Sequence, residues 1–437
     1  MSHVITRFPP SPTGHMHVGN IRSLLFNYLY AKKHNGEIVL RFEDTDRERS
    51  SQEFADEMLN DLKILGLDHD KGPFYQSQRT DIYASKIKEL IDAGHAYEGE
   101  ESNDGSGKVI RFKNPNTSVT FHDAVRGDIT IDTTDFGDFV IARSMNNPLY
   151  HLTVVVDDIE GGITHVIRGE DHITSTPRQI LLIKALGGDV PEYAHLPLII
   201  GDDKKKLGKR HGAVYLQQFL EDGYLPSALI NYLALLGWNP GDEREIFTKE
   251  ELIKDFSLER VQKSPATFSY TKLQDINKAH MQMLTQDQYA LHVCSFMTQD
   301  SLVCIDESMM SRFINTVLKE RISHFGEVKD MENEGELSYL IERPKRDEEL
   351  MSFKDESFDS GHNLAVQAVE RLSQISDGSW TVDVIKETLW EWTAEVGRGN
   401  VLHPLRTMLS GQKRSPDPFT LAYVLGKEET INRIKSI

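Results

Sequence analysis

Apolar and polar positions in the first hundred residues follow two periods, one typical of strands and one typical of helices. Residues 4–8 and 38–42 are short runs rich in β-branched and aromatic side chains, which predict buried strands. Between them, apolar residues from Ile21 to Leu29 recur at helical spacing. Further helices are predicted after a Ser50–Glu53 capping-box pattern and over residues 80–93. This alternation of strands and helices predicts a parallel sheet with crossover helices.

The pattern changes in the middle of the chain. Residues 109–143 have the character of strands separated by turns, so a β-rich insert is predicted to interrupt the α/β unit. Val154–Val156 predicts a buried strand, and residues 179–186 predict a helix. Beyond about residue 210 the helical period dominates to the end. Within that region, the acidic stretch 347–359 predicts a solvated surface or loop.

Composition and charge narrow the class of protein. A chain of 437 residues suggests about three domains, and a hydrophobic fraction of 39% excludes a disordered or fibrous protein. The net charge of −19 means that any nucleic-acid contact must come from local basic patches. The two cysteines, Cys294 and Cys304, are too few for a disulfide framework or a four-thiolate metal site. No apolar run of about 18 residues and no signal-peptide core occur, so we expect no membrane span and a cytoplasmic location.

A first candidate site lies between the first predicted strand and the first predicted helix. Residues 10–20 (PSPTGHMHVGN) form a glycine-containing turn that opens a helix. Such a turn suits phosphate, because helix-terminal N–H groups favour anions and glycine permits close backbone approach. His17 and Asn20 would add side-chain donors. Taken alone, the pattern is better explained by ordinary turn glycines and capping histidines.

A second candidate site is the densest basic cluster of this acidic chain, residues 204–212 (KKKLGKRHG). Lysines that flank a glycine would clamp a polyphosphate and neutralise the charge that builds up as pyrophosphate leaves. Taken alone, the stretch is more often a solvated basic turn. A strand–turn–helix phosphate site followed by such a loop is an unusual pairing, and together the two patterns favour nucleotide chemistry.

At these residues the chain resembles the bacterial glutamyl-tRNA synthetases. Residues 7–50 look like the amino-terminal segment of that family, and His17–Asn20 (HVGN) stands where the family has its HIGH signature. Residues 206–210 (KLGKR) stand where it has its KMSKS signature. Further matching stretches, in the expected order, are residues 150–158, 166–172, 176–179, 233–242, 258–266, 404–406, 415–416 and 425–428. The resemblance is weak only around residues 98–108 and 285–390.

The resemblance implies a class I synthetase with an α/β fold. A split Rossmann-type parallel-sheet catalytic domain with a β-containing insert would be followed by all-helical stem-contact and anticodon-binding domains. The predicted domains are residues 1–96 and 146–205 for the two catalytic halves, 97–145 for the connective insert that binds the acceptor end, 206–285 for the KMSKS-like loop and stem-contact region, and 286–437 for the anticodon-binding domains.

The resemblance also implies an activity and its residues: L-glutamate would be activated with ATP to glutamyl-adenylate, then transferred to the 3′-terminal adenosine of tRNA(Glu). Arg7 and Arg168 match the family's substrate arginines, and planar guanidinium groups bind carboxylates bidentately. The implied glutamate-binding residues are Arg7, Pro9, Ser11, Glu43, Tyr150 and Arg168. The implied ATP-binding residues are Pro10, Gly14, His17, Gly19, Asn20, Asp171, Leu207 and Lys209. His17, Asn20, Lys206 and Lys209 are the implied catalytic residues, acting by positioning and charge stabilisation.

Departures from the family pattern qualify these expectations. Gly99 and Glu101 occupy spots where many members carry zinc-binding cysteines, so we predict no structural zinc and no other protein-held metal. Gly208 replaces the usual serine of the second signature, which predicts weaker ATP binding, and Pro9 replaces a common alanine. The expected cofactor is ATP with Mg²⁺ bridging its phosphates. The expected partners are L-glutamate and tRNA(Glu), with a monomer as the family expectation and no membrane.

Alternative functions stay open at this stage. A degenerate tRNA-binding paralogue without activation activity would explain Gly208, Pro9 and the missing zinc cysteines. A non-discriminating enzyme would also charge tRNA(Gln). A glutaminyl-tRNA synthetase is disfavoured because the predicted ending is helical, whereas those enzymes carry β-barrel anticodon domains.

Overall fold

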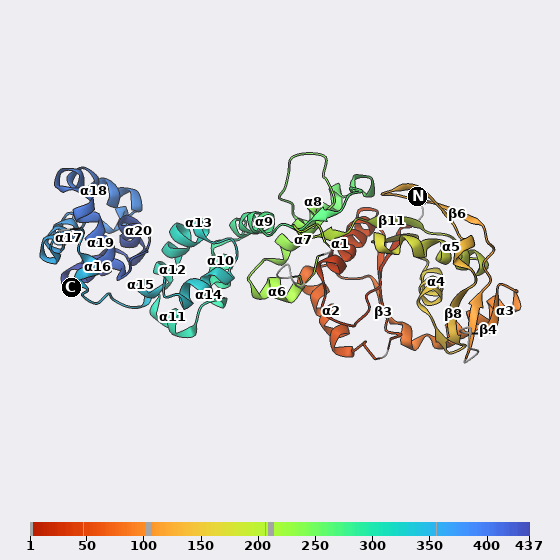
Figure 1. The fold of residues 1–437 in the computed structure, drawn as a ribbon. Coiled ribbons are helices and arrows are strands. Elements are labelled where there is room, and N and C mark those ends of the chain that lie inside the picture. The colour runs from red at the N-terminus through yellow and green to blue at the C-terminus, as the bar shows by residue number, and fades with distance from the viewer. Residues whose placement is uncertain (1–2, 47, 101–106, 206, 209–213, 355) are drawn as a thin grey trace. The chain divides into compact units, whose positions relative to one another are not determined.

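The computed structural model consists of two compact units, shown in Figure 1. The first unit comprises Met1–Leu220 and Pro226–Ile276, and the second comprises Glu221–Leu225 and Asn277–Ile437. The chain therefore passes between the units three times. The structure describes residues 3–46, 48–100, 107–205, 207–208, 214–354 and 356–437.

The described elements follow in chain order. Up to residue 282 they are β1 (Ile5–Phe8), α1 (Val18–Lys33), β2 (Glu37–Phe42), α2 (Gln52–Leu65), β3 (Lys71–Tyr75), η1 (Gln76–Gln78), α3 (Thr80–Asp92), β4 (Ala96–Glu100), β5 (Lys108–Phe112), β6 (Ser118–Asp123), β7 (Gly127–Asp132), η2 (Thr134–Phe136), β8 (Phe139–Ser144), β9 (Asn147–Pro148), α4 (Tyr150–Glu160), β10 (His165–Gly169), η3 (Glu170–Ser175), α5 (Thr176–Ala185), β11 (Glu192–Leu196), β12 (Ile199–Ile200), α6 (Leu216–Glu221), α7 (Pro226–Leu235), α8 (Lys249–Asp255), η5 (Leu258–Arg260), β13 (Ala266–Thr267) and α9 (Tyr270–Gln282). The remaining elements are α10 (Gln286–Ser295), α11 (Gln299–Cys304), α12 (Glu307–Phe313), η6 (Ile314–Leu318), α13 (Lys319–Arg321), α14 (Gly326–Asn333), α15 (Ser338–Ile341), α16 (Glu348–Met351), α17 (Phe358–Leu372), η7 (Asp377–Ser379), α18 (Val382–Val396), α19 (Arg398–Ser410), α20 (Pro418–Leu425) and α21 (Lys427–Ser436).

The first unit is built on parallel strands from two separate parts of the chain. β1, β2 and β3 pair in parallel in that order, and β10 pairs in parallel with β11. The Ile5 carbonyl accepts a hydrogen bond of 2.9 Å from the Thr164 N–H, just before β10, which places the second part beside β1. The predicted parallel sheet, interrupted by an insert, is confirmed.

The β-rich insert shares its core with the parallel strands. β4, β5, β8 and β9 form one antiparallel sheet, whereas the β6–β7 hairpin joins the edge of β11. Val39 of β2, Phe112 of β5, Phe121 of β6 and Leu152 of α4 are buried in one hydrophobic cluster. Burial of this apolar surface in a common core stabilises insert and sheet together.

All regular elements among the described residues of the second unit are helices, as the sequence pattern predicts. Glu221–Leu225 packs there through a tight turn at Gly223, whose carbonyl accepts a 3.1 Å hydrogen bond from the Phe325 N–H. Gly223 has a φ of +80°, and a Cβ added to it would lie 2.4 Å from the Gly326 nitrogen. Only glycine fits this position without a shift of backbone.

Three local predictions need correction. Val154–Val156 lies in helix α4 and not in a strand, because a buried run of three β-branched residues does not distinguish the two by itself. The cap of α2 is Ser51, whose hydroxyl accepts from the Phe54 N–H at 3.2 Å, so the Ser50–Glu53 capping box is wrong by one residue. The acidic stretch 347–359 is mostly exposed in its described residues, as predicted, but it is not all loop, because Asp347 caps α16 and α17 begins at Phe358.

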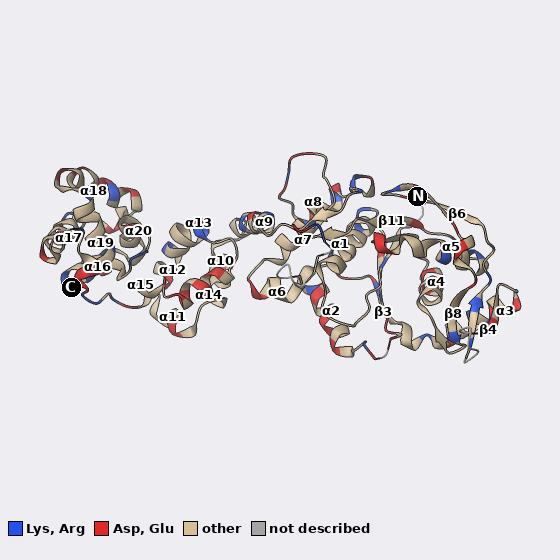
Figure 2. Cartoon of the chain, viewed as in Figure 1, with Lys and Arg blue, Asp and Glu red and all other residues tan. Residues whose placement is uncertain are grey.

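Figure 2 shows Asp and Glu spread over both units with Lys and Arg among them. Among the helices that the structure describes, none combines the length and the apolar character that a membrane crossing requires.

A buried carboxylate joins α2 to the segment that starts α6. Asp61 is fully buried and accepts a 2.7 Å hydrogen bond from the Gln217 amide. Its second oxygen has no hydrogen-bond partner among the described residues. Burial raises the pKa of Asp61 to about 6, although the bond from Gln217 opposes this shift. A carboxyl group whose pKa is higher in the folded state than in the unfolded state destabilises the fold when it is ionised.

We therefore predict that Asp61→Asn raises the free energy of unfolding at pH 7.5 by about 1–3 kcal/mol, since it removes the buried charge and keeps an acceptor for Gln217. The gain should shrink as the pH falls from 7 towards 4, because wild-type Asp61 is itself neutral there. Urea denaturation of wild type and variant at pH 7.5 and near pH 4 measures the difference between their free energies of unfolding. Asp56→Asn, an exposed position on the same helix, is the control. An unchanged or lower stability of Asp61→Asn at pH 7.5 contradicts the prediction.

Candidate functional site

A cavity of about 610 Å³ opens where β1 and β10 end and α1 begins. Ligands of open parallel sheets bind at the carboxyl ends of the strands, and this volume lies in the usual range of ligand sites. The predicted site residues that line it are Arg7, Pro9, Pro10, Ser11, Gly14, His17, Gly19, Asn20, Glu43, Tyr150, Arg168, Asp171 and Leu207. Lys206 and Lys209 lie outside the described residues.

His17 caps helix α1. Its Nδ1 accepts a 3.1 Å hydrogen bond from the Gly19 N–H, and the Asn20 side chain accepts from the His17 N–H at 3.4 Å. A neutral imidazole that accepts at Nδ1 carries its proton at Nε2, which makes that nitrogen a donor. The capping explanation and a role as a donor to a phosphate are therefore compatible.

The backbone N–H groups at the start of α1 are already engaged, which differs from the expectation of open phosphate donors. The Val18 N–H donates to the Val214 carbonyl at 2.9 Å, and the Asn20 N–H donates to the His17 carbonyl at 2.8 Å. Anion binding at this helix end would therefore depend on side chains and on the helix dipole. The sequence could not show this, because Val214 comes from far along the chain.

Arg7 lies on β1 beneath the cavity and is almost fully buried. Its Nε is 3.6 Å from Asp158 Oδ2, close enough for an ion pair but too far for a hydrogen bond. Arg41 donates to the same carboxylate at 2.7 Å and to Glu43 at 3.2 Å. Burial raises the pKa of Glu43, while Arg41 opposes the shift. A cationic ammonium beside Glu43 would favour its ionised form.

Arg168 extends from β10, which lies beside β1, into the same cavity and contacts only neutral acceptors. Its Nη1 donates to Gln179 Oε1 and its Nη2 to Thr176 Oγ1, each at 2.8 Å. Burial lowers the pKa of Arg168. Beside it, the Tyr150 hydroxyl lies 3.2 Å from His172 Nδ1, and burial raises the pKa of Tyr150. Two arginines from different strands thus face one cavity.

Several residues that hold this site were not singled out from the sequence. Arg41 donates to Glu43, and Gln179 and Thr176 accept from Arg168. Asp158 accepts from Arg41 and forms an ion pair with Arg7. Asp158, Thr176 and Gln179 stand in stretches that match the family. The sequence signal that could have identified Asp158 is the pair of adjacent carboxylates, Asp157 and Asp158, in the buried run that precedes β10.

Within the residues described, no group of three His, Cys, Asp or Glu side chains is arranged to hold a metal ion. Gly99 lies on β4, and Glu101 falls outside the described residues.

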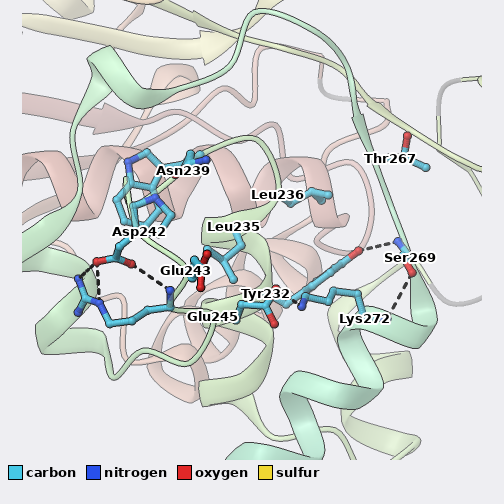
Figure 3. Close-up of a pocket in the computed structure, with 13 residues that line it drawn as sticks. Tyr232, Leu235, Leu236, Asn239, Asp242, Glu243, Glu245, Thr267, Ser269 and Lys272 are labelled. Atoms are coloured by element: carbon cyan, nitrogen blue, oxygen red, sulfur yellow. Dashed lines mark hydrogen bonds and ion pairs between the residues drawn. The ribbon is translucent and has the colours of Figure 1, made fainter.

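A second cavity, of about 320 Å³, is lined by residues from the stretch 232–272 (Figure 3). Lys272 forms an ion pair with Glu245, and Arg244 forms ion pairs with Asp242 and Asp255. The Tyr232 hydroxyl accepts a 2.7 Å hydrogen bond from the Ser269 N–H (Figure 3). None of the predicted site residues lies here, so the larger cavity is the better candidate.

Comparison with known proteins identifies the family of the chain. Residues 3–105 and 99–275 match the model of the catalytic domain of class I tRNA synthetases (E and Q), and residues 276–437 match an anticodon binding domain. A glutamate–tRNA ligase of Aquifex aeolicus is 40% identical over 99% of this chain and 98% of its own length. One from Methylobacillus flagellatus is 37% identical over the same shares.

A solved structure gives the same result. The glutamate tRNA ligase of Elizabethkingia meningosepticum, crystallised in complex with its amino acid, aligns with a TM-score of 0.85 and 29% identity over 100% of this chain and 99% of that one. The glutamate–tRNA synthetase of Elizabethkingia anophelis aligns over the same shares with a TM-score of 0.83. Since the two matching models together span nearly the whole sequence, the chain belongs to the class I tRNA synthetases of the glutamate and glutamine (E and Q) family.

Proposed function

We propose that this chain is a glutamate–tRNA ligase, which activates L-glutamate with ATP and transfers it to the 3′-terminal adenosine of tRNA(Glu). The observation that carries the proposal is the pair of buried arginines, Arg7 and Arg168, in one cavity with the start of α1. Glutamate has two carboxylates, and guanidinium groups are suited to bind them. The names of the full-length relatives support the same substrate.

The first step needs little acid–base catalysis. A carboxylate oxygen of glutamate attacks the α-phosphorus of ATP, and the bond to the bridging oxygen breaks, which releases pyrophosphate. Because the nucleophile is already ionised, the protein contributes position and electrostatic stabilisation. We assign Arg7 and Arg168, with Tyr150, to the carboxylates of glutamate and Glu43 to its ammonium group. Pro9 and Ser11, which also line the cavity, complete the proposed glutamate pocket.

The nucleotide would lie at the α1 side of the cavity. We assign His17 and Asn20 to the triphosphate, and Lys206 and Lys209 to the departing pyrophosphate. Pro10, Gly14, Gly19, Asp171 and Leu207, which line the same cavity, would contact ATP. In the second step a ribose hydroxyl of tRNA attacks the activated carbonyl carbon, an ester forms and AMP leaves.

The proposal extends to the domains and partners. The five-domain division, with boundaries at residues 96, 145, 205 and 285, remains our proposal for how the chain divides its contacts with tRNA. We also propose a monomer that acts in the cytoplasm. Charging of tRNA(Gln) is a second candidate, which the anticodon-binding part of the chain would decide.

ATP–pyrophosphate exchange with glutamate, with and without tRNA, tests the proposal together with charging of separate tRNA(Glu) and tRNA(Gln) transcripts. We expect glutamate-dependent exchange and charging of tRNA(Glu). Charging of both transcripts would identify a non-discriminating enzyme. If no exchange occurs even with tRNA, the protein is a degenerate paralogue and the proposed function is wrong.

Replacement of Arg7 tests the glutamate site. Arg7→Ala should raise the KM for glutamate by at least tenfold and change the KM for ATP little, since a charge-assisted contact contributes about 1.5–3 kcal/mol. Both KM values come from the exchange assay, and the KM for ATP is the internal control. Equal effects on the two substrates would remove Arg7 from the glutamate site.

Metal analysis tests the absence of a structural zinc. Purified protein should contain no stoichiometric zinc, because Gly99 stands where a cysteine ligand is common in the family. Plasma emission spectrometry after dialysis without chelator gives the metal content. One zinc per chain would show that other residues hold the metal.

A further inference from the structure

A buried pair of side chains, Asp123 and His195, lies behind the substrate arginine Arg168. Both are fully buried. His195 Nδ1 is 2.6 Å from Asp123 Oδ2, and Arg168 Nε donates to His195 Nε2 at 3.2 Å. The three side chains come from the end of β6, from β11 and from β10, where the strands lie side by side. They form a continuous chain of hydrogen bonds from a carboxylate to a guanidinium.

The partners leave His195 one tautomer. Arginine is a donor only, so His195 Nε2 must accept, and the ring proton must lie on Nδ1, where Asp123 accepts it. Asp123 is held as an acceptor by the backbone N–H groups of Val125, Arg126 and His195, at 2.8–3.0 Å. Burial lowers the pKa of His195, although the hydrogen bond to Asp123 raises it. The ring is therefore a neutral connector between two opposite charges.

Arg168 differs from the other buried arginines of the site in its charge partners. Arg41 contacts Asp158 and Glu43 directly. Arg168 has no carboxylate within 4.0 Å among the described residues; Asp158 acts on its charge from a longer distance, and hydrogen bonds connect it to Asp123 through the His195 ring. A buried cation without a carboxylate in contact is a strong binding group for an incoming anion, since the cost of its desolvation is already met within the fold.

The contacts of Arg168 with neutral partners also leave N–H groups that can donate to a ligand. Arginine carries five N–H groups. His195, Gln179 and Thr176 take one each from Nε, Nη1 and Nη2, and a long contact of 3.5 Å joins Nη2 to the His172 carbonyl. The second N–H of Nη1 then has no acceptor among the described residues, and the second N–H of Nη2 has only the long contact with the His172 carbonyl, which a ligand oxygen at short distance would replace. Two such donors on one guanidinium edge match the two oxygens of a carboxylate.

We propose that Asp123 and His195 are positioning residues for glutamate: His195 holds the Nε edge of Arg168, and Asp123 fixes the tautomer that lets it do so. The inference rests on the proposed function, and it assigns Arg168 a role that depends on two residues outside the cavity. A directly contacting carboxylate would occupy the terminal N–H groups of Arg168 and compete with the substrate. Placing the negative charge one ring away stabilises the cation and leaves its substrate edge open.

Two substitutions of His195 separate positioning from packing. An asparagine amide lies near the former Nδ1 and keeps the donor to Asp123, whereas a glutamine amide reaches the former Nε2 and keeps the acceptor for Arg168. His195→Asn should raise the KM for glutamate at least tenfold in the exchange assay with tRNA and leave the KM for ATP within about twofold. His195→Gln should restore most of the glutamate affinity. Two equally impaired variants, or equal losses for both substrates, would overturn the proposal.

Asp123→Asn is a second test that does not alter the ring. Its NH2 group must face either His195 or the backbone N–H groups, which are donors as well, so one hydrogen bond of the Asp123 carboxylate is lost. Because the tautomer of His195 is then no longer fixed, we expect at least a tenfold rise in the KM for glutamate. A normal KM for glutamate in a folded Asp123→Asn protein would refute the role of Asp123. His165→Asn, a buried histidine at the start of β10, is the control and should keep the wild-type KM. Wild-type protein that activates no glutamate would instead refute the proposed function itself.

Discussion

The site depends on a buried network of arginine and carboxylate side chains that neutralise one another. Arg41 lies 2.7 Å from Asp158, 3.2 Å from Glu43 and 3.5 Å from Asp157, and Arg79 donates to Asp157 at 2.8 Å. Removing one partner from such a network leaves an uncompensated charge in a medium of low polarity. Because β2, α4 and the start of α3 contribute these groups, the network fixes the carboxyl end of β2 relative to the two helices. The floor of the cavity is therefore preorganised before any ligand arrives.

The two buried arginines of one cavity, which come from the neighbouring strands β1 and β10, have their charges balanced in different ways. On the β1 side, Arg7 shares the carboxylate of Asp158 with Arg41. On the β10 side, Arg168 is surrounded by an amide, a hydroxyl and an imidazole. The first arrangement favours rigidity, and the second keeps a cation available to a ligand. Because the two arginines have different partners, the charge in the cavity is distributed asymmetrically. A molecule with two carboxylates and one ammonium group can therefore be held there in one orientation.

The sequence predicted what is local and missed what depends on distant pairing. The strands at residues 4–8 and 38–42 and the helix from Ile21 follow from short-range periodicity, and the structure has them. Val154–Val156 was wrong because burial on a helix face and burial in a sheet select the same residues. The motif residues could be placed at one cavity because strand ends and helix starts lie at one edge of the sheet. Asp123 and His195, 72 positions apart, acquire their roles only through the pairing of β6 with β11.

The short segment Glu221–Leu225 has a consequence for how such a chain can be dissected or recombined. Its Leu225 N–H donates to the Asn277 side chain at 2.8 Å, and the Gly223 turn fits against Phe325 and Gly326 without room for a Cβ. A cut at residue 276 would consequently leave behind a piece of the helical unit, still attached to the other fragment. Exchange of that unit between relatives would have to transfer both stretches of sequence together, because the two units do not meet at one single position of the chain.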